Sequence, residues 1–331
     1  MQNKPRIDET DAKILTSLLR ESRATFTSIA KDCKISIGAV KARYDRLKRE
    51  GVINGEIMQV DPRVMGYNTV VDLEIATAVE DESSAIEFLK SKPYIARIGA
   101  GAFWKFNIRA FAVSSNIERL ANIQEELDAN PLIKEIHTLI WAEVTGMDHP
   151  ENLQINEHTT TKKKQDEDQT KPQTATSHPQ MRLDETDRQI AKILTRNARI
   201  PFKRIAEQLN ISTKSVIQRY QKLRGTLLTV SAITVDLKKL GYNALAHVLI
   251  KSIRRSEMPR IYKQILEIPN AIVTIRLIGP YDLRVIYALK DFDDVFTLNQ
   301  KIREIKGIEQ ADTYLIAPFP EWPLNFFASL L

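Results

Sequence analysis

The chain has 331 residues, of which 43% are hydrophobic and 27% are charged, so packed cores are expected and a wholly disordered or collagen-like chain is excluded. With 48 basic and 42 acidic side chains the formal charge is +6, which permits nucleic acid as a partner. The single cysteine, Cys33, excludes an intramolecular disulfide and a thiolate metal cage, and the sequence contains neither a run of 18 apolar residues nor a secretory leader. We therefore expect a cytoplasmic protein.

One long module occurs twice in the sequence. The stretch Arg6 to Asp11 (Arg-Ile-Asp-Glu-Thr-Asp) recurs as Arg182 to Asp187 (Arg-Leu-Asp-Glu-Thr-Asp), and Gly66-Tyr67-Asn68 recurs as Gly241-Tyr242-Asn243. Self-similarity of this kind indicates a tandem fusion. Residues 146–180 lie between the copies, are rich in Thr, Gln and Lys, and are expected to form a disordered linker.

Each module begins with three predicted helices. The first follows an acidic N-cap, Asp8 or Asp184, and carries an apolar stripe at helical spacing. The second is short, and the third begins at a serine N-cap, Ser36 or Ser212. This is the layout of a helix-turn-helix, whose last helix enters the major groove of DNA. A purely structural three-helix bundle is the competing interpretation.

A mixed segment of strands and helices follows in each module. In the first module the periodicity predicts strands at 53–60, 69–76, 95–98, 106–113 and 133–140 and helices at 83–90 and 114–129. In the second it predicts strands near 244–253, 272–278, 283–288 and 308–316 and helices near 258–266 and 292–305. The order β-α-β-β-α-β is that of a ferredoxin-like domain.

The predicted fold class is therefore α+β, with two tandem modules. Each module is a winged-type helix-turn-helix followed by a ferredoxin-like domain. The expected helix-turn-helix domains are residues 6–60 and 181–236, and the expected ferredoxin-like domains are residues 61–145 and 237–331, the latter with an apolar C-terminal tail.

The third helix of each module supplies the candidate DNA-binding residues. In the first copy Ala39 and Ala42 would meet thymine methyl groups and Arg46 would meet guanine or phosphate, whereas in the second copy Gln218 would read adenine through two hydrogen bonds. The two half-sites are therefore expected to differ. The candidate set is Ser36, Gly38, Ala39, Lys41, Ala42, Arg43, Arg46, Lys48, Arg49, Ser212, Lys214, Ser215, Gln218, Arg219 and Lys222.

Two of these cations have a second candidate role. Arg43 and Arg219 lie on the flank of the inward face of the third helix and would pair with acids of the first helix, such as Asp11 and Asp187. The phosphate role and the ion-pair role remain open for both arginines.

A series of short motifs runs along the first module: Asp8-x-x-Asp11-x-x-Ile14-Leu15, Ile29-Ala30, Ser36-x-x-x-Val40-x-x-Arg43-x-x-x-Leu47-x-x-x-Gly51-Val52-Ile53 and Gly66-Tyr67. These motifs resemble the leucine-responsive regulator/AsnC (Lrp/AsnC) family of prokaryotic transcription regulators, and the resemblance covers nearly all of both modules. It implies a sequence-specific DNA-binding regulator whose partners are double-stranded DNA and an amino acid or similar small effector. It also implies an intramolecular pseudo-dimer or a homo-oligomer, with no enzyme activity, cofactor or metal.

The second copy departs from the pattern at the end of its third helix. Leu227 and Leu228 stand where Gly51 and Val52 follow that helix in the first copy. Because leucine resists the positive φ that glycine accepts, the exit from this helix must differ between the copies.

The resemblance also implies where an effector would bind. The family's Gly-x-x-Asp turn, near its effector pocket, is present in the second copy at Gly279, Tyr281 and Asp282, whereas the first copy has Gly101 and then Trp104 in place of the acid. Ligand sensing is therefore expected in the second copy. A plain hairpin turn is the competing interpretation, because glycine and aspartate are ordinary turn residues.

A tetrapyrrole-handling enzyme of the sirohaem decarboxylase type is the alternative that shares this architecture. Proteins of that class look to carry an Arg-x-His-x-Tyr-Asn stretch ahead of the third strand, and neither copy has a histidine there. His149, His158 and His178 lie in the expected linker, while His137 and His247 lie on expected strands, and all five are expected to be surface or packed residues. The apolar tail after Pro318 is expected to cover its own module.

Overall fold

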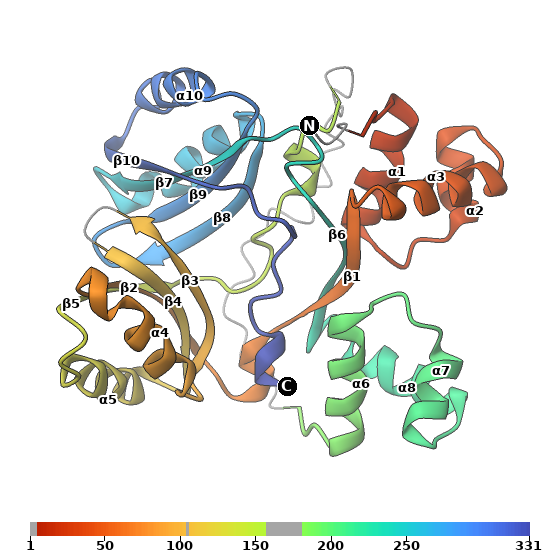
Figure 1. The fold of residues 1–331 in the computed structure, drawn as a ribbon, viewed down its shortest axis with the longest axis horizontal. Helices are drawn as coiled ribbons and strands as arrows, with labels where there is room; N and C mark the ends of the chain where they lie inside the picture. Colours follow the sequence, from red (N-terminus) through yellow and green to blue (C-terminus); the bar gives the residue numbers. More distant parts are fainter. Residues whose placement is uncertain (1–4, 104–105, 157–180) are drawn as a thin grey trace.

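Two trihelical units form the N-terminal parts of the modules in the computed structural model, which describes residues 5–103, 106–156 and 181–331 (Figure 1). The units comprise α1 (Glu9–Arg20), α2 (Phe26–Cys33) and α3 (Ile37–Arg49), and α6 (Glu185–Arg196), α7 (Phe202–Leu209) and α8 (Thr213–Leu223). A capping box fixes the start of each first helix, because the Asp8 carboxylate accepts from the Asp11 N–H and the Asp11 carboxylate accepts from the Asp8 N–H, as Asp184 and Asp187 do in the second unit.

A two-stranded antiparallel ribbon joins the two modules. Its strands are β1 (Ile53–Val60) and β6 (Leu228–Val235), each of which follows the last helix of its trihelical unit. The sequence predicted β1 but not β6. The helix exits do differ, as expected: α3 runs on to Arg49 and turns at Gly51 with φ of 70°, whereas α8 ends earlier and turns at Gly225 with φ of 76°.

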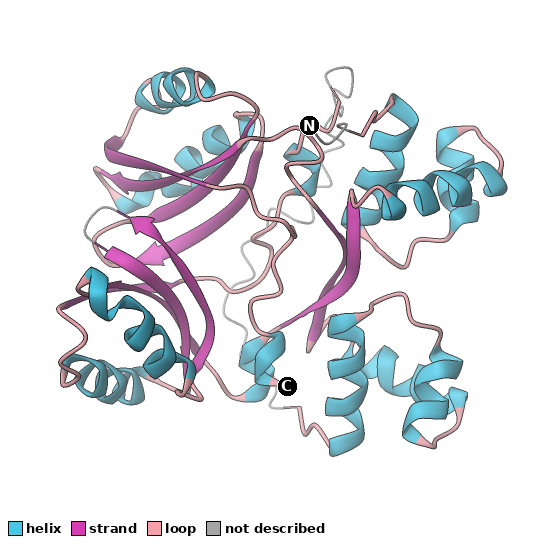
Figure 2. Cartoon of the chain, in the orientation of Figure 1, coloured by secondary structure: helices cyan, strands magenta, loops and turns pink. Residues whose placement is uncertain are grey.

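The ferredoxin-like halves share a single eight-stranded sheet in the order β10-β7-β9-β8-β5-β2-β4-β3 (Figure 2). The first half comprises β2 (Thr69–Ala76), α4 (Glu82–Lys90), β3 (Ile95–Phe103), β4 (Phe106–Ser114), α5 (Ile117–Asp128) and β5 (Glu135–Trp141). The second half comprises β7 (Ala244–Ser252), α9 (Met258–Glu267), β8 (Ala271–Ile278), β9 (Leu283–Leu289), α10 (Asp294–Arg303) and β10 (Ile308–Ile316). The α+β class and the two tandem modules are thus confirmed.

The sheet folds over on itself, so that its two halves face each other. β5 and β8 are hydrogen-bonded over a short stretch, from Ile140 opposite Ile278 to Trp141 opposite Leu277. Asp72 on β2 contacts Arg284 on β9, although two other strands separate β2 from β9 in the order of the sheet. The outer faces pack beneath α4 and α5 or beneath α9 and α10, and the inner faces join the core of the ribbon and the trihelical units.

Residues 142–156 cross from the first module onto the second. They run along the free edge of β8, where the Thr274 N–H donates to the Met147 carbonyl and the His149 N–H donates to the Ile272 carbonyl, both at 2.9 Å. Leu153 and Ile155 are buried against the core. The expectation that a disordered linker begins at residue 146 is therefore wrong for residues 146–156, because backbone pairing to an open strand edge and two buried apolar side chains fix this segment. Residues 157–180 of the expected linker lie outside the described residues.

The C-terminal tail makes the reverse crossing, from the second module onto the first. Trp322 is fully buried and exchanges backbone hydrogen bonds with Val235. Phe326 packs edge-on against Phe111 and Trp141, with ring centroids 5.0 and 5.6 Å away. The expectation that the tail covers its own module is correct for Trp322, which pairs with β6 of the second module, and wrong for Phe326, because the aromatic pocket that accepts Phe326 belongs to β4 and β5 of the first module.

None of the helices in the described parts of the chain is long and apolar enough to cross a membrane.

Replacing Phe326 by alanine should lower the free energy of unfolding by about 3–5 kcal/mol, because the side chain is 5% exposed and its removal leaves a cavity between the tail and the first module. Urea unfolding followed by tryptophan fluorescence measures the change. Phe296→Ala is the matched control, since Phe296 is 66% exposed on α10 and its loss should change the stability by less than about 0.5 kcal/mol. Equal effects of the two substitutions would show that the tail does not stabilise the fold.

Replacing Asp148 by asparagine should stabilise the protein at neutral pH. Burial raises the pKa of the Asp148 carboxyl, which accepts a hydrogen bond of 2.7 Å from Gln59, from 3.8 to about 6. The folded state therefore holds this proton more tightly than the unfolded state, so the charged carboxylate lowers stability progressively as the pH rises from about 4 through 6. Unfolding midpoints for D148N should exceed those of the parent at pH 7.5 and match them at pH 4. A gain at pH 4 as large as at pH 7.5 would contradict this assignment.

Candidate nucleic-acid interface

The exposed faces of α3 and α8 differ in chemistry. Both helices bury the same positions, Val40 and Tyr44 in α3 and Val216 and Tyr220 in α8. The face of α3 that points away from the core carries small or mixed side chains, among them Gly38, Lys41, Ala42 and Asp45. The corresponding face of α8 carries Lys214, Ile217, Gln218 and Gln221. One helix therefore offers a mostly small surface and the other a polar, basic one.

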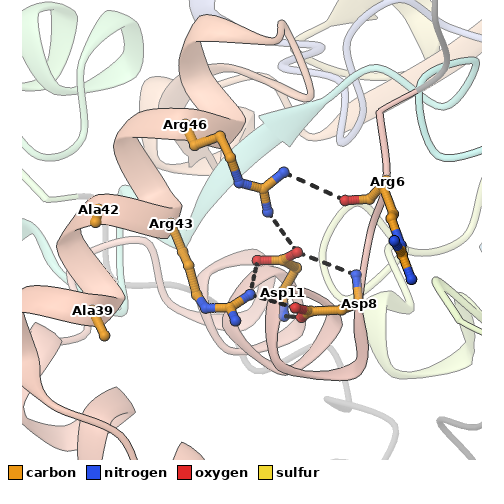
Figure 3. Close-up of a pocket in the computed structure, with 7 residues that line it drawn as sticks. All are labelled: Arg6, Asp8, Asp11, Ala39, Ala42, Arg43 and Arg46. Atoms are coloured by element: carbon orange, nitrogen blue, oxygen red, sulfur yellow. Dashed lines mark hydrogen bonds and ion pairs between the residues drawn. The ribbon is translucent and has the colours of Figure 1, made fainter.

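Acidic side chains of the first helix hold the central cations of α3 (Figure 3). Arg43 Nη1 lies 2.7 Å from Asp8 and 2.8 Å from Asp11, and Arg46 Nη2 lies 2.6 Å from Asp11, whose side chain is 1% exposed. Arg46 also reaches the Arg6 carbonyl at 3.4 Å. Together with Ala39 and Ala42 these residues line a hollow between α1 and α3.

The second module repeats this arrangement. Arg219 Nη1 lies 2.6 Å from Asp184 and 2.7 Å from Asp187, and Lys222 Nζ lies 2.8 Å from Asp187. The hydrogen bond from Arg219 is the largest cause that lowers the pKa of Asp184. The ion-pair role considered for Arg43 and Arg219 is thus present in both modules, where it fastens the third helix to the first.

The other candidate residues fall into three groups. Ser36 and Ser212 are N-caps, because their hydroxyl groups accept from the N–H groups of Ala39 and Ser215. Lys48 lies 2.8 Å from the buried Glu56 at the start of the ribbon. No ion pair joins Lys41, Arg49 or Lys214 to another residue that the structure describes, and all three are exposed, as are Gly38, Ala42 and Gln218.

Two arginines outside the candidate set hold the two units together. Arg23 of the first unit lies over the ring of Phe202 in the second, 4.2 Å from its centroid, and donates to the Ala198 carbonyl. Arg199, at the equivalent position of the second unit, lies 4.8 Å from the ring centroid of Phe26 and donates to the Ser22 carbonyl. Arg23 and Arg199 thus each make a cation–π contact and a hydrogen bond to the opposite trihelical unit, and together these contacts fix the separation of α3 and α8.

The expected effector turn is already occupied by contacts within the protein. The Asp282 carboxylate accepts from the Ser252 N–H, the Ser252 hydroxyl and Arg255 Nε, at 2.7 to 2.9 Å. Tyr281 donates its hydroxyl to Asp312. Gly279 has φ of 149° beside β5 of the first module. Gly101 lies on the edge strand β3, and Trp104 lies outside the described residues. Asp282 therefore ties the turn between β8 and β9 to the end of β7 and to Arg255.

The histidines follow the sequence expectation in part. His137 is exposed and His247 is packed between the sheet halves. His149 is not a linker residue: its ring is buried, and its Nε2 lies 2.7 Å from the Thr274 hydroxyl. Among the residues that the structure describes, no group of three His, Cys, Asp or Glu side chains is placed to hold a metal ion.

Comparisons with known proteins cover both modules. An AsnC-type helix-turn-helix domain matches residues 183–224, and a winged helix-turn-helix DNA-binding domain matches residues 7–54. The HTH-type transcriptional regulator LysM of Saccharolobus solfataricus is 30% identical over 135 residues, which are 40% of this chain and 93% of that protein. An uncharacterized HTH-type transcriptional regulator of Pyrococcus horikoshii is 31% identical over 139 residues, 41% of this chain and 93% of that protein.

A solved structure matches the whole chain. The siroheme decarboxylase NirDL superposes with a TM-score of 0.63 at 14% identity, covering 98% of this chain and 96% of that one. At this identity the likeness shows the fold alone. The tandem arrangement of two helix-turn-helix and two ferredoxin-like units is therefore shared between this chain and that enzyme.

Arg219→Ala should lower the free energy of unfolding by about 1–3 kcal/mol, because the fully buried carboxylate of Asp187 loses one of its two cations. The control is Lys214→Ala on the same helix, which should change the stability by less than about 0.5 kcal/mol. Urea unfolding measures both. If Arg219→Ala were as mild as Lys214→Ala, the ion pairs to Asp184 and Asp187 would not fasten α8 in solution.

Proposed function

We propose that this chain, which belongs to the Lrp/AsnC family of prokaryotic transcription regulators, binds one operator through both of its recognition helices, α3 and α8. Each helix would read one half-site, and the two half-sites would differ in sequence. The membership rests on the AsnC-type domain in the second module and on regulators about 30% identical that the chain matches over nearly their whole length. The two helix-turn-helix units make DNA binding the plain expectation for such a chain.

The observation that carries the two-half-site proposal is the paired trihelical units. Both lie on the same side of the β1–β6 ribbon, away from the eight-stranded sheet (Figure 1). The reciprocal contacts of Arg23 and Arg199 hold them in one relation to each other. A rigid pair of unlike recognition helices suits an operator whose halves differ in sequence and lie at a fixed spacing.

The candidate residues then divide by role. We assign contact with bases and phosphates to exposed or half-buried residues of α3 and α8, namely Gly38, Ala39, Lys41, Ala42, Arg49, Lys214, Ser215 and Gln218. We assign positioning of the same helices to Ser36, Arg43, Arg46, Lys48, Ser212, Arg219 and Lys222, which cap the helices or pair with buried acids. Lys41, Arg49 and Lys214 have no ion-pair partner among the residues that the structure describes, and DNA phosphates would supply their counter-charges.

An effector is proposed on family membership alone. An amino acid or a similar small molecule would act at the ferredoxin-like domains, at the turn from Gly279 to Asp282. A thermal-shift screen of amino acids with the intact chain tests this, and Asp282→Asn should abolish any shift that arises at the turn.

A second candidate function follows from the whole-chain likeness to siroheme decarboxylase NirDL, a protein whose structure has also been solved with an iron-uroporphyrin III analogue. Under this alternative the two halves of the sheet would handle a tetrapyrrole. Absorption titration with iron-uroporphyrin III distinguishes the two: saturable binding with a shifted Soret band favours the enzyme, and no shift favours the regulator.

Selection from a pool of random DNA duplexes should enrich a sequence with two unlike halves. Gln218→Ala should relax the choice of base in one half, at about 1–3 kcal/mol for a lost bidentate contact with adenine. Ala42→Asp should weaken the other half, because it places a negative charge on the exposed face of α3 without touching the core. Lys214→Ala should reduce affinity on all sequences and lower the salt slope by about one.

Glu80→Gln is the control, since Glu80 is exposed in the first ferredoxin-like half, far along the chain from both helix-turn-helix units. It should leave selection and affinity unchanged. Absence of any enriched sequence, or binding that is indifferent to Gln218→Ala and Ala42→Asp, would refute the proposed function.

A further inference from the structure

An exposed arginine precedes the first helix of each trihelical unit. Arg6 lies two residues before the N-cap Asp8, and Arg182 lies two residues before the N-cap Asp184. Both arginine side chains are exposed, and no ion pair joins either of them to another residue that the structure describes. Neither arginine belongs to the candidate set taken from the third helices, so both are cations without an assigned role.

A cation of the third helix holds the backbone at each of these arginines. Arg46 Nη1 on α3 lies 3.4 Å from the Arg6 carbonyl oxygen, and Lys222 Nζ on α8 lies 3.4 Å from the Arg182 carbonyl oxygen (Figure 3 shows the first contact). The same contact thus occurs in both modules, although the cation is an arginine in one and a lysine in the other. The chain before each first helix is therefore fastened beside the third helix, while its arginine side chain remains exposed.

The hollow between α1 and α3 places Arg6 next to the proposed base-reading residues. Arg6 lies on one side of this hollow, and Ala39 and Ala42 lie on the other (Figure 3). In helix-turn-helix proteins the third helix enters the major groove while the first helix crosses the DNA backbone. A duplex that meets Ala39 and Ala42 with its bases would therefore bring the backbone at the edge of the groove to the side where Arg6 lies.

The other charges around this hollow are already paired with each other. Asp8 and Asp11 bind Arg43, and Asp11 also binds Arg46, which in turn lies 3.1 Å from Glu50. These paired groups are two cations and three carboxylates, so they carry no excess of positive charge that would attract a phosphate. Among the described residues that line the hollow, the arginine that precedes α1 is the cation that contacts no carboxylate.

The second module has the same arrangement with one more positive charge. Arg219 and Lys222 bind Asp184 and Asp187, and no third carboxylate contacts these two cations among the residues that the structure describes. The four paired groups balance, so Arg182 adds a positive charge that no carboxylate of this group cancels. We therefore expect a phosphate to bind beside α6 at least as strongly as beside α1.

We propose that Arg6 and Arg182 bind phosphates of the DNA backbone, and that Arg46 and Lys222 are positioning residues that hold these two arginines beside the recognition helices. The inference rests on the proposed function and deepens it, because phosphate contacts fix the register and orientation of a protein on a duplex. Arginine suits the task, since its planar guanidinium group donates two parallel hydrogen bonds to one phosphate.

The salt dependence of binding to a labelled duplex of arbitrary sequence tests the proposal, because phosphate contacts do not require an operator. Fluorescence anisotropy of the full chain with this duplex gives the slope of log K against log salt concentration. Arg6→Gln and Arg182→Gln should each lower the slope by about one, and the double variant should lower it by about two. Arg6→Lys keeps the positive charge and should keep the slope of the parent.

Arg119→Gln is the matched control, since Arg119 is an exposed arginine on α5 of the first ferredoxin-like half. It should leave the slope and the affinity unchanged. The urea unfolding midpoints of the three glutamine variants should match that of the parent, because all three side chains are exposed.

The positioning role has its own readout. Arg46 acts through the backbone of Arg6 and not on a phosphate, so the double variant Arg6→Gln, Arg46→Gln should have the same slope as Arg6→Gln alone. A further decrease of about one in the double variant would show that Arg46 itself contacts a phosphate, and would overturn the proposal.

A slope that neither Arg6→Gln nor Arg182→Gln changes, or that Arg119→Gln lowers equally, would also overturn the proposal, as would a parent that binds no duplex at any salt concentration. The proposed function fails separately. A selected operator with unchanged slopes would support the regulator without these contacts, whereas lowered slopes without any selected operator would support the contacts without sequence-specific regulation.

Discussion

Antiparallel pairing of one module against the other is the constraint on which the rest of the structure depends. The β1–β6 ribbon provides the backbone part of this pairing, and Arg23 and Arg199 provide a side-chain part at its two sides. Each arginine binds carbonyl groups and an aromatic ring of the opposite trihelical unit, so neither unit has its complete set of contacts alone. The positions of α3 and α8 relative to each other follow from these contacts and not from the third helices themselves.

The acids of the first helices perform a second, local task. Asp11 and Asp187 are buried, cap the start of α1 and α6 and bind cations from α3 and α8. Arg43, Arg46, Arg219 and Lys222 therefore neutralise carboxylates inside the protein, and this ion pairing competes with any contact that they would make with DNA. This division explains why a basic recognition helix is not uniformly a DNA-contacting one: Arg43 and Arg219 orient the helix, whereas exposed residues such as Gln218 carry the chemistry that would read bases.

The segments that follow β5 and β10 each cross to the other module, and the second of them also joins the eight-stranded sheet to the β1–β6 ribbon. Residues 142–156 run along β8 of the second module, and the C-terminal tail reaches β4 and β5 of the first, so each module contributes a segment to the other. The tail also lies beside the ribbon, where Trp322 pairs with Val235 and Asn325 donates to the Met58 carbonyl at 3.0 Å. The tail therefore contacts both the eight-stranded sheet and the strands β1 and β6, which follow the helix-turn-helix units.

The sequence by itself determined the repeated modules, the helix caps and most of the strands. These features are local: a capping residue, a period of two or 3.6 and a turn glycine act on neighbours a few residues away, and residues such as Asp8 and Ser36 carry the signal in their own positions. The ion-pair role of Arg43 could also be foreseen, because Arg43 flanks the inward face of the third helix and Asp11 belongs to the first helix, against which that face packs.

Only the tertiary structure decided how the modules meet. Strand β6 was missed although it is equivalent to β1 and pairs with it, because β6 is buried along most of its length and lacks the alternation of buried and exposed positions that β1 shows. The apolar segments around Leu153 and Phe326 could not be placed, since burial against the other module leaves no periodic pattern in the sequence. The ion pair of Arg284 with Asp72 was equally hidden: an arginine and an aspartate on strands look like surface residues until the sheet folds over and sets them side by side.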